Sequence, residues 1–469
     1  VIEKEWILPS EDHSLLPGDL LTVRFKGTPG GQASFSIGRH IENIPMVEKK
    51  SPVAGIYEGF HIFQPEDKVE QKQIRFHFEV PGLGRKRFES KAEVTILPGS
   101  WPRVARTDGN EPAYLAAGLG KERLGGAILG MLPSGTLLEL SGRVGSAWRV
   151  KLSPSLSAWI DRDLVELLSP TTAPPRSLVR TCSIQNGPRE DIFSISLEER
   201  IPFTISPGLE HPSLSIDLFG ATSNLSWLSE KANSGLIRHV HWKQVEDNRL
   251  RMILELSQAP VWGYSASYAG GSSLLRVRIK HPPVQAAPEQ QPLTGLKIAL
   301  DPGHGGSNRG AIGCLGIPEK ELNLKMVSRV SRHLESLGAE IILIRTADKT
   351  IDNIERPMEA IQQGADLFIS LHANSIGMSS DPERTRGVSV YWRYPAFNSL
   401  SRRLYENLLE LGLEPFGVIG SFNASVLKFT DIPCVLIETG FMSHPEEEAF
   451  LLNENSQESI AGAIGRGLV

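Results

Sequence analysis

Two histidines in the C-terminal half, His304 and His372, each follow a short apolar run and precede a turn of small residues. A third apolar run, residues 435–437, leads directly into Glu438. Because the carboxyl ends of parallel strands meet at one edge of a sheet, we expect these three side chains to lie close together. Imidazole and carboxylate groups are the ligands of hydrolytic zinc sites, which take three protein ligands and leave a fourth position open. The spacing therefore predicts a site for one zinc ion.

A carboxylate would complete the ligand set, and the residues alone leave two candidates. Glu319 and Glu321 both stand at the start of the helix predicted after the first histidine loop. Zinc makes water ionise near neutral pH, and a separate group must then accept and return the proton. Glu438 has the right chemistry at the right edge, so the pattern predicts metal-assisted hydrolysis with Glu438 as general base and acid.

Other residues of reactive type receive plainer interpretations. His239 and His241 have the spacing of a metal pair, but no third ligand stands nearby, so an exposed strand face is favoured. Cys314 is interpreted as a packed thiol. The glycines after His304 lack the spacing of a phosphate-binding loop, and no nucleotide site is predicted.

The segment that carries these residues, 293–469, alternates between strand and helix patterns. Met326, Val330, Leu334 and Leu337 fall on one helical stripe, which Gly338 closes. Such alternation predicts an α/β domain with a mostly parallel sheet covered by helices on both faces. Buried strands are expected at residues 296–300, 341–344 and 367–371.

Proline-rich breaks at 97–102, 169–175 and 286–292 divide the chain into four expected domains. Residues 1–98 show the alternation of a β-sandwich, somewhat similar to an immunoglobulin-type module. Residues 99–170 resemble a small bacterial barrel of the Src-homology-three-like kind, in which Trp148 and Trp159 either fill the core or stack on a ligand. Residues 177–285 are β-rich and loosely similar to the AMIN domain, and residues 293–469 form the catalytic domain.

The composition narrows the function classes. A net charge of −5 over 469 residues gives no support for nucleic-acid binding. No apolar run is long enough for a transmembrane helix. The three cysteines are too scattered for a disulfide framework or a thiolate zinc site. The chain begins without methionine, so we expect a processed chain from which any signal peptide is already gone.

Four ordered motifs, at residues 301–306, 319–324, 371–374 and 436–442, resemble those of the zinc-dependent N-acetylmuramoyl-L-alanine amidases. The resemblance covers roughly residues 296–469. It implies that His304, Glu319 and His372 hold one Zn²⁺ ion and that Glu438 is the catalytic base and acid. It also implies cleavage of the amide bond between the lactyl group of N-acetylmuramic acid and the first L-alanine of the stem peptide.

The resemblance further implies a peptidoglycan hydrolase of the bacterial cell envelope, periplasmic or secreted, with envelope partners reached through the β-rich domains. Asn374 and Arg356 are predicted to bind substrate or to support loops, and the sequence does not separate these roles. Two alternatives are a catalytically inactive wall-binding protein and a zinc peptidase that cuts within the stem peptide.

Some positions depart from the family pattern. Asn308 and Arg309 stand where Asp-Pro is common, and His444 stands where asparagine is usual. Relatives that block their own site use a long helical insertion in the connection that here spans residues 375–386. This connection is short, so we expect a site that is not blocked in that way.

Overall fold

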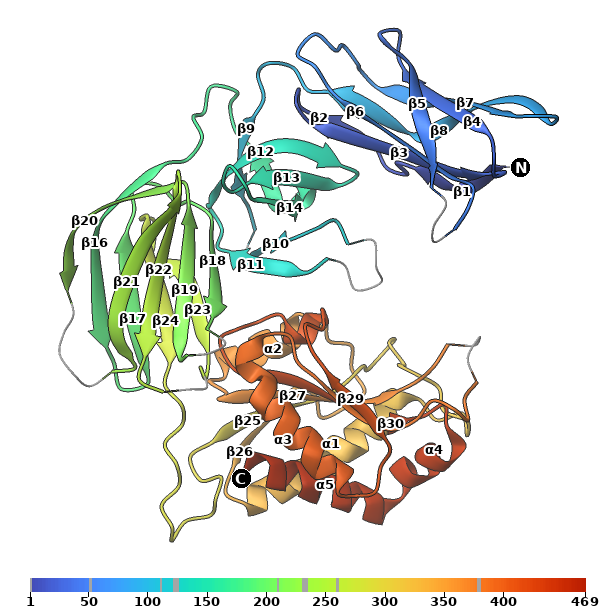
Figure 1. Ribbon diagram of the computed structural model, residues 1–469. Coiled ribbons are helices and arrows are strands. Elements are labelled where there is room, and N and C mark those ends of the chain that lie inside the picture. The colour runs from blue at the N-terminus through green and yellow to red at the C-terminus, as the bar shows by residue number, and fades with distance from the viewer. Residues whose placement is uncertain are drawn as a thin grey trace.

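The computed structural model describes residues 2–49, 53–109, 112–120, 126–208, 211–229, 235–258, 261–377 and 381–469. Three β-rich regions precede a C-terminal domain in which strands and helices alternate (Figure 1). Within these described ranges no helix combines the length and the apolar character needed to cross a membrane.

The first region alternates buried and exposed side chains along its strands. In β7, Ile74, Phe76 and Phe78 are buried while Arg75 is exposed, which confirms the predicted half-buried strand. Its sheet runs in the order β1-β3-β6-β5-β4-β7-β8-β2. The strands are β1 (Ile2–Leu8), β2 (His13–Leu15), β3 (Leu20–Gly27), β4 (Gln32–Ile37), β5 (Ile41–Lys49), β6 (Ile56–Ile62), β7 (Lys72–Val80) and β8 (Gly84–Ile96).

The short strand β2 joins the first region to the second. It pairs in parallel with β8 and antiparallel with β12, so hydrogen bonding continues across the boundary expected at residue 98. The second region contains β9 (Arg103–Thr107), β10 (Ala113–Ala116), β11 (Ile128–Leu132), β12 (Leu137–Val144), β13 (Ala147–Lys151), β14 (Ser157–Asp161), the 3₁₀ turn η1 (Arg162–Leu164) and β15 (Val165–Leu167).

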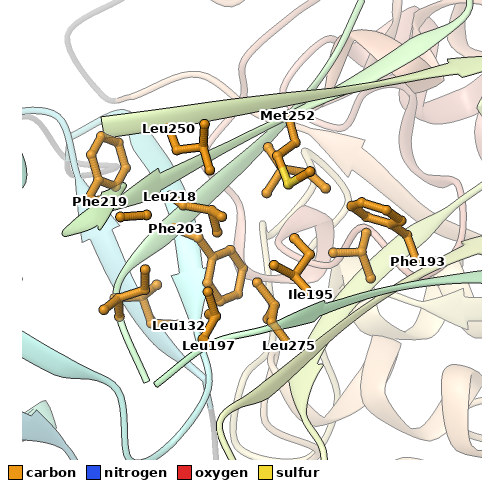
Figure 2. Packing of buried hydrophobic residues seen from close by; sticks show 14 of the residues in the cluster. Leu132, Phe193, Ile195, Leu197, Phe203, Leu218, Phe219, Leu250, Met252 and Leu275 are labelled. Atoms are coloured by element: carbon orange, nitrogen blue, oxygen red, sulfur yellow. The ribbon is translucent and has the colours of Figure 1, made fainter. Parts of the chain in front are cut away.

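The third region has two sheets, ordered β20-β16-β17-β24-β23 and β18-β19-β22-β21. Their apolar faces share one buried cluster that also takes in side chains of the second region. Figure 2 shows Leu132 of β11 in this cluster together with Phe203 and Leu197. The strands are β16 (Ser177–Asn186), β17 (Glu190–Ser196), β18 (Phe203–Pro207), β19 (Ser213–Phe219), β20 (Ala221–Ser229), β21 (Ile237–Glu246), β22 (Arg249–Leu256), β23 (Tyr264–Tyr268) and β24 (Leu274–Lys280).

The C-terminal domain is built on a six-stranded sheet ordered β26-β25-β27-β30-β28-β29. All neighbouring strands in it are parallel except β28 and β30, which are antiparallel. Its elements are β25 (Lys297–Pro302), α1 (Glu319–Ser336), β26 (Glu340–Leu343), α2 (Glu355–Gln362), β27 (Leu367–Asn374), β28 (Val388–Tyr391), η2 (Pro395–Phe397), α3 (Asn398–Leu409), β29 (Pro415–Ile419), η3 (Ser425–Leu427), β30 (Cys434–Phe441), α4 (Pro445–Leu452) and α5 (Glu454–Leu468).

Helices lie on both faces of this sheet. Apolar side chains of α1, α3 and α5 pack with one set of strand residues, and those of α2 and η3 pack with the opposite set. Of the predicted stripe, Met326, Val330 and Leu334 are buried in α1, whereas Leu337 follows the last helical residue and is half-buried. The helix ends before Gly338, whose φ is +95°. The predicted helix and its end are confirmed.

The third region is docked on the C-terminal domain by hydrogen bonds that backbone carbonyls accept. The Tyr264 amide donates to the Thr430 carbonyl at 2.7 Å, and the Thr430 hydroxyl donates to the Tyr264 carbonyl at 2.6 Å. The Lys280 ammonium donates to the Ala365 carbonyl at 2.7 Å. These contacts fix β23 beside the segment that leads into β30.

Candidate metal centre

Three side chains from separate elements meet at the carboxyl edge of the sheet. His304 lies in the loop after β25, Glu319 opens α1, and His372 lies near the end of β27. His304 Nε2 is 3.0 Å from Glu319 Oε2, and His372 Nδ1 is 2.9 Å from Glu319 Oε1. One ligand atom from each residue lies within 4.8 Å of the other two, so the group could hold a metal ion.

The Glu319 carboxylate is held by several donors at once. Its side chain is buried, Oε2 accepts the Ala311 amide at 2.9 Å, and Oε1 accepts the Ala373 amide at 3.2 Å and Asn323 Nδ2 at 3.1 Å. Burial opposes its charge, but the hydrogen bonds from His304 and His372 outweigh burial and hold the pKa of Glu319 well below its usual range. The carboxylate is therefore ionised and fixed in orientation.

Glu319 and Glu321 were the two candidates for the carboxylate ligand, and only Glu319 faces the histidines. Glu321 lies in the same first turn of α1 but is exposed. Positions two apart in a helix point to different faces, so only one of the pair can reach the sheet edge.

His304 has a backbone conformation that few non-glycine residues adopt, with φ +64°. Asn308 Oδ1 lies 3.0 Å from His304 Nδ1 and sets the ring orientation, which leaves Nε2 toward Glu319. The departure from the family pattern at Asn308 thus has a supporting contact. Space for the ring comes from Gly310, where a Cβ atom would lie 2.7 Å from His304 Cδ2.

Gly303 provides the same kind of space for the second histidine. A Cβ atom at this position would lie 2.2 Å from His372 Cε1. A side chain at Gly303 would therefore displace the His372 ring.

Two buried arginines hold the loop that carries His304. Arg345 donates to the carbonyls of Pro302 at 2.8 Å and Gly303 at 2.9 Å. Arg356 pairs with buried Asp301 at 2.6 Å and donates to the His304 carbonyl at 2.7 Å. Of the two roles predicted for Arg356, these contacts correspond to loop support. The sequence signal missed Arg345, because its partners are backbone carbonyls of a distant segment.

Glu438 lies directly opposite His372 in the register of β27 and β30. Side chains at paired positions of adjacent parallel strands emerge on the same face. Its Oε2 atom is buried and has no hydrogen-bond partner among the described residues. Burial, and then the negative charge of Glu319, raise the pKa of Glu438 well above its usual range. The Glu438 carboxyl group thus lies beside the cluster, on the strand next to His372.

Tyr391 is a polar neighbour of Glu438 that the sequence analysis did not single out. Its hydroxyl lies 3.5 Å from Asn374 Nδ2 and 3.3 Å from Ser389 Oγ. Burial raises the pKa of Tyr391, and the Glu438 charge raises it further. Tyr391 occurs in no recognisable motif, so only the pairing of β28 with β30 reveals it.

The interpretation of the pair His239 and His241 as part of an exposed strand face is confirmed, whereas that of Cys314 is not. His239 and His241 lie on the exposed side of β21, and His241 pairs with Glu255 at 2.9 Å. Cys314 is exposed, so the prediction of a packed thiol is wrong; its thiol donates weakly to the Ser443 carbonyl at 3.3 Å. In the part of the chain that the structure describes, the group of His304, Glu319 and His372 is the one candidate metal cluster.

Comparison with known proteins points to the same domain. The profile of a family described as N-acetylmuramoyl-L-alanine amidase matches residues 298–469. The chain belongs to this amidase family through its C-terminal domain. All four residues of the centre, with Glu438 included, fall inside the matched amidase segment.

Curated relatives that match the amidase segment are named as probable cell wall amidases. The chain is 31% identical over 188 residues to the probable cell wall amidase LytH of Staphylococcus epidermidis, which is 40% of this chain and 62% of that protein. It is 31% identical over 182 residues to LytH of Staphylococcus aureus, with 38% and 60% covered. The chain thus spans less than two thirds of the length of these relatives.

Among solved structures, the catalytic domain of CwlV, an N-acetylmuramoyl-L-alanine amidase from Bacillus (Paenibacillus) polymyxa var. colistinus, is 30% identical. The match covers 37% of this chain and 96% of that one, with a TM-score of 0.35. The amidase AmiC2 of Nostoc punctiforme is 31% identical, with 37% and 94% covered and a TM-score of 0.35.

Proposed function

We propose that this chain is a zinc-dependent peptidoglycan hydrolase. It cleaves the amide bond between the lactyl group of N-acetylmuramic acid and the L-alanine of the stem peptide. The observation that carries the proposal is the arrangement of His304, Glu319 and His372 beside Glu438, on the strand next to His372. A ligand set with a proton-accepting carboxyl group at its side is the minimum that metal-assisted hydrolysis needs.

The three donors suit zinc. Two neutral imidazoles and one ionised carboxylate form the His₂Glu set found in hydrolytic zinc enzymes, which leaves one position open. When bound, zinc supplies the Lewis acidity that lets water ionise near neutral pH. Magnesium and calcium prefer oxygen ligands throughout, so the two imidazoles argue against both.

Proton transfer falls to Glu438. In the proposed reaction, Glu438 Oε2 accepts a proton from the water that attacks the lactyl carbonyl carbon. As the carbon–nitrogen bond breaks, the same carboxyl group returns the proton to the leaving nitrogen of L-alanine. The products are a lactyl carboxylate on the glycan and a stem peptide with a free amino end. We propose that Asn374 contacts the substrate at this rim, with Tyr391 beside it.

The remaining assignments follow from the same proposal. The β-rich regions are accessory domains with the boundaries 1–98, 99–170 and 177–285, and they reach the cell wall or envelope partners. The curated relatives named cell wall amidases support action outside the cytoplasm. We place this chain in the bacterial cell envelope, periplasmic or secreted.

Product analysis tests the reaction. The zinc-loaded full chain is incubated with purified peptidoglycan, and the soluble products are identified by mass spectrometry. We expect intact stem peptides that begin with L-alanine, together with peptide-free glycan. Fragments cut inside the stem peptide would assign a zinc peptidase instead. Binding to the wall without products, despite bound zinc, would assign an inactive wall-binding protein.

A further inference from the structure

A groove lies between the second region and the C-terminal domain, with a volume of about 730 Å³. One wall comes from β10, β14 and η1 and includes Tyr114 and Trp159. The opposite wall comes from the C-terminal domain and includes Asn353, Phe422 and Asn423. Asn423 Nδ2 donates to the Gly126 carbonyl at 3.1 Å and ties the two walls together.

Two chain segments connect this groove to the metal centre. On one side, the Phe422 ring packs on the Tyr391 ring at 4.5 Å, and the Tyr391 hydroxyl lies near Asn374, two residues after His372. On the other side, Asn353 lies two residues after Ile351. The carbonyl of Ile351 accepts the same Arg356 nitrogen that donates to the His304 carbonyl. The Tyr391 side chain therefore lies between Phe422 in the wall of the groove and Asn374 at the rim of the candidate catalytic site.

The two tryptophans of the second region have different surroundings, which answers the question that the sequence left open. Trp148 packs against the buried cluster shared by the second and third regions. Trp159 is half-buried, is not part of that packing, and lines the groove. Core filling thus accounts for Trp148, and Trp159 presents a ring to a ligand space.

The lining chemistry favours an uncharged, polyhydroxylated ligand. Among the described lining residues only Asp161 and Lys428 are charged, and both are engaged. Asp161 accepts the Asp163 amide at 3.1 Å, and the Lys428 ammonium lies 4.4 Å from the centre of the Tyr114 ring. The Asn423 carboxamide is engaged with Gly126 and Arg393. The groove therefore offers a ligand aromatic surface together with the carboxamide of Asn353, which suits sugar rings with apolar faces and polar rims.

We propose that this groove binds the glycan strand of peptidoglycan next to the muramic acid whose amide is cut, with Trp159 and Asn353 as binding residues. This inference rests on the proposed function for the identity of the polymer. The glycan backbone is neutral once its lactyl groups are amide-linked, whereas stem peptides carry ionised groups. The second region is then part of the substrate site, and a catalytic domain without it lacks one wall.

Calorimetric titration of the zinc-loaded full chain tests the proposal, with neutral N-acetylglucosamine oligomers as the glycan probe and free stem peptide as a separate probe. We expect Trp159→Ala to weaken glycan binding at least tenfold and Asn353→Ala to weaken it from the opposite wall. Trp227→Ala is the matched control, because Trp227 is 67% exposed on β20 and lies outside the groove. Trp159→Phe should restore part of the affinity.

Steady-state kinetics on two substrates distinguish glycan binding at the groove from the hydrolytic reaction. On intact peptidoglycan, Trp159→Ala should raise KM at least tenfold with little change in kcat. On a single muramoyl peptide, which has no glycan extension, the variant should match the wild type. Unchanged glycan binding in both Trp159→Ala and Asn353→Ala, or binding of stem peptide at this groove, would overturn the proposal. Glycan binding that depends on Trp159 in a chain without amidase products would overturn the proposed function and keep the groove.

Discussion

His372 and Glu438 occupy directly paired positions on the parallel strands β27 and β30. One is a candidate ligand and the other a candidate proton carrier, and the sheet fixes their separation. Neither residue depends on a loop for its position, so the pair is set by the hydrogen-bond register of the core. Sites built on strands hold their geometry more closely than sites built on loops alone.

Glu438→Gln should keep the metal and lose turnover by roughly 10²–10⁴-fold, the usual contribution of a positioned acid–base group. Glutamine retains the shape but cannot accept the proton. Metal content is measured by elemental analysis, and activity by release of stem peptides from purified wall. Wild-type turnover in this variant would refute the role assigned to Glu438.

Glu319→Gln should lose metal, whereas Glu321→Gln should retain both metal and activity. Loss of a group that only orients a ligand costs about 10–100-fold in affinity, so loss of a ligand should cost more. The two positions share the first turn of α1, which makes them a matched pair. Competition with a zinc chelator measures the affinity. Equal affinities in the two variants would contradict the assignment.

Gly303→Ala should weaken metal binding and leave the fold largely intact. The added Cβ atom meets the His372 ring at 2.2 Å, so the histidine must move away from Glu319. Gly377→Ala is the control, because a Cβ atom there has no neighbour within 4 Å. Chelator competition and thermal unfolding distinguish a displaced ligand from a damaged domain. A Gly303→Ala variant with wild-type zinc affinity would show that the loop relaxes freely.

Arg356→Met should destabilise the C-terminal domain by about 3–5 kcal/mol, since it leaves the Asp301 charge buried and unpaired. A second substitution, Asp301→Asn, should recover part of the loss. Thermal unfolding of the wild type, both single variants and the double variant at one pH gives the comparison. An additive loss in the double variant would mean that the pair is not coupled.

Asp217→Asn should destabilise the third region at pH 7, by about 1–3 kcal/mol for loss of hydrogen bonds to a charged group. Burial opposes the Asp217 charge, but Arg251 and Arg249 outweigh burial and lower the pKa of Asp217. A lowered folded-state pKa contributes stability above the unfolded value of about 3.9, and this is lost as pH falls through the folded value. The difference from wild type should therefore shrink at acidic pH.

The comparison is made by thermal unfolding from pH 7 downward. Asp163→Asn serves as the control, because its side chain is 87% exposed. A difference between Asp217→Asn and wild type that does not change with pH would contradict the ion-pair explanation.

The sequence was sufficient to predict the cluster because strand ends of a parallel sheet meet at one edge. His304 and His372 could be placed there from the apolar runs before them, and the helical stripe predicted α1. The supporting residues could not be predicted in this way. Arg345 contacts the loop from a distant position, and nothing local in its sequence marks this contact.

The contacts between the β-rich regions could not be predicted from the sequence either. Residues 13–15 form a strand between β8 and β12. A run of three residues is too short to show a pattern that predicts either pairing. The buried cluster shared by the second and third regions depends on how two separately patterned surfaces face each other. Packing between residues far apart in the sequence depends on the complete fold and not on any local pattern.

The shared apolar cluster joins the second region to the third, and the Tyr264–Thr430 contacts join the third region to the C-terminal domain. A tethered binding module would let the cutting centre sample many bonds around one anchoring point. Domains packed directly against one another instead keep a fixed distance between the residues that bind the polymer and the residues that cut it. The proposed enzyme would then remove stem peptides at one fixed distance from the point where it binds the glycan strand.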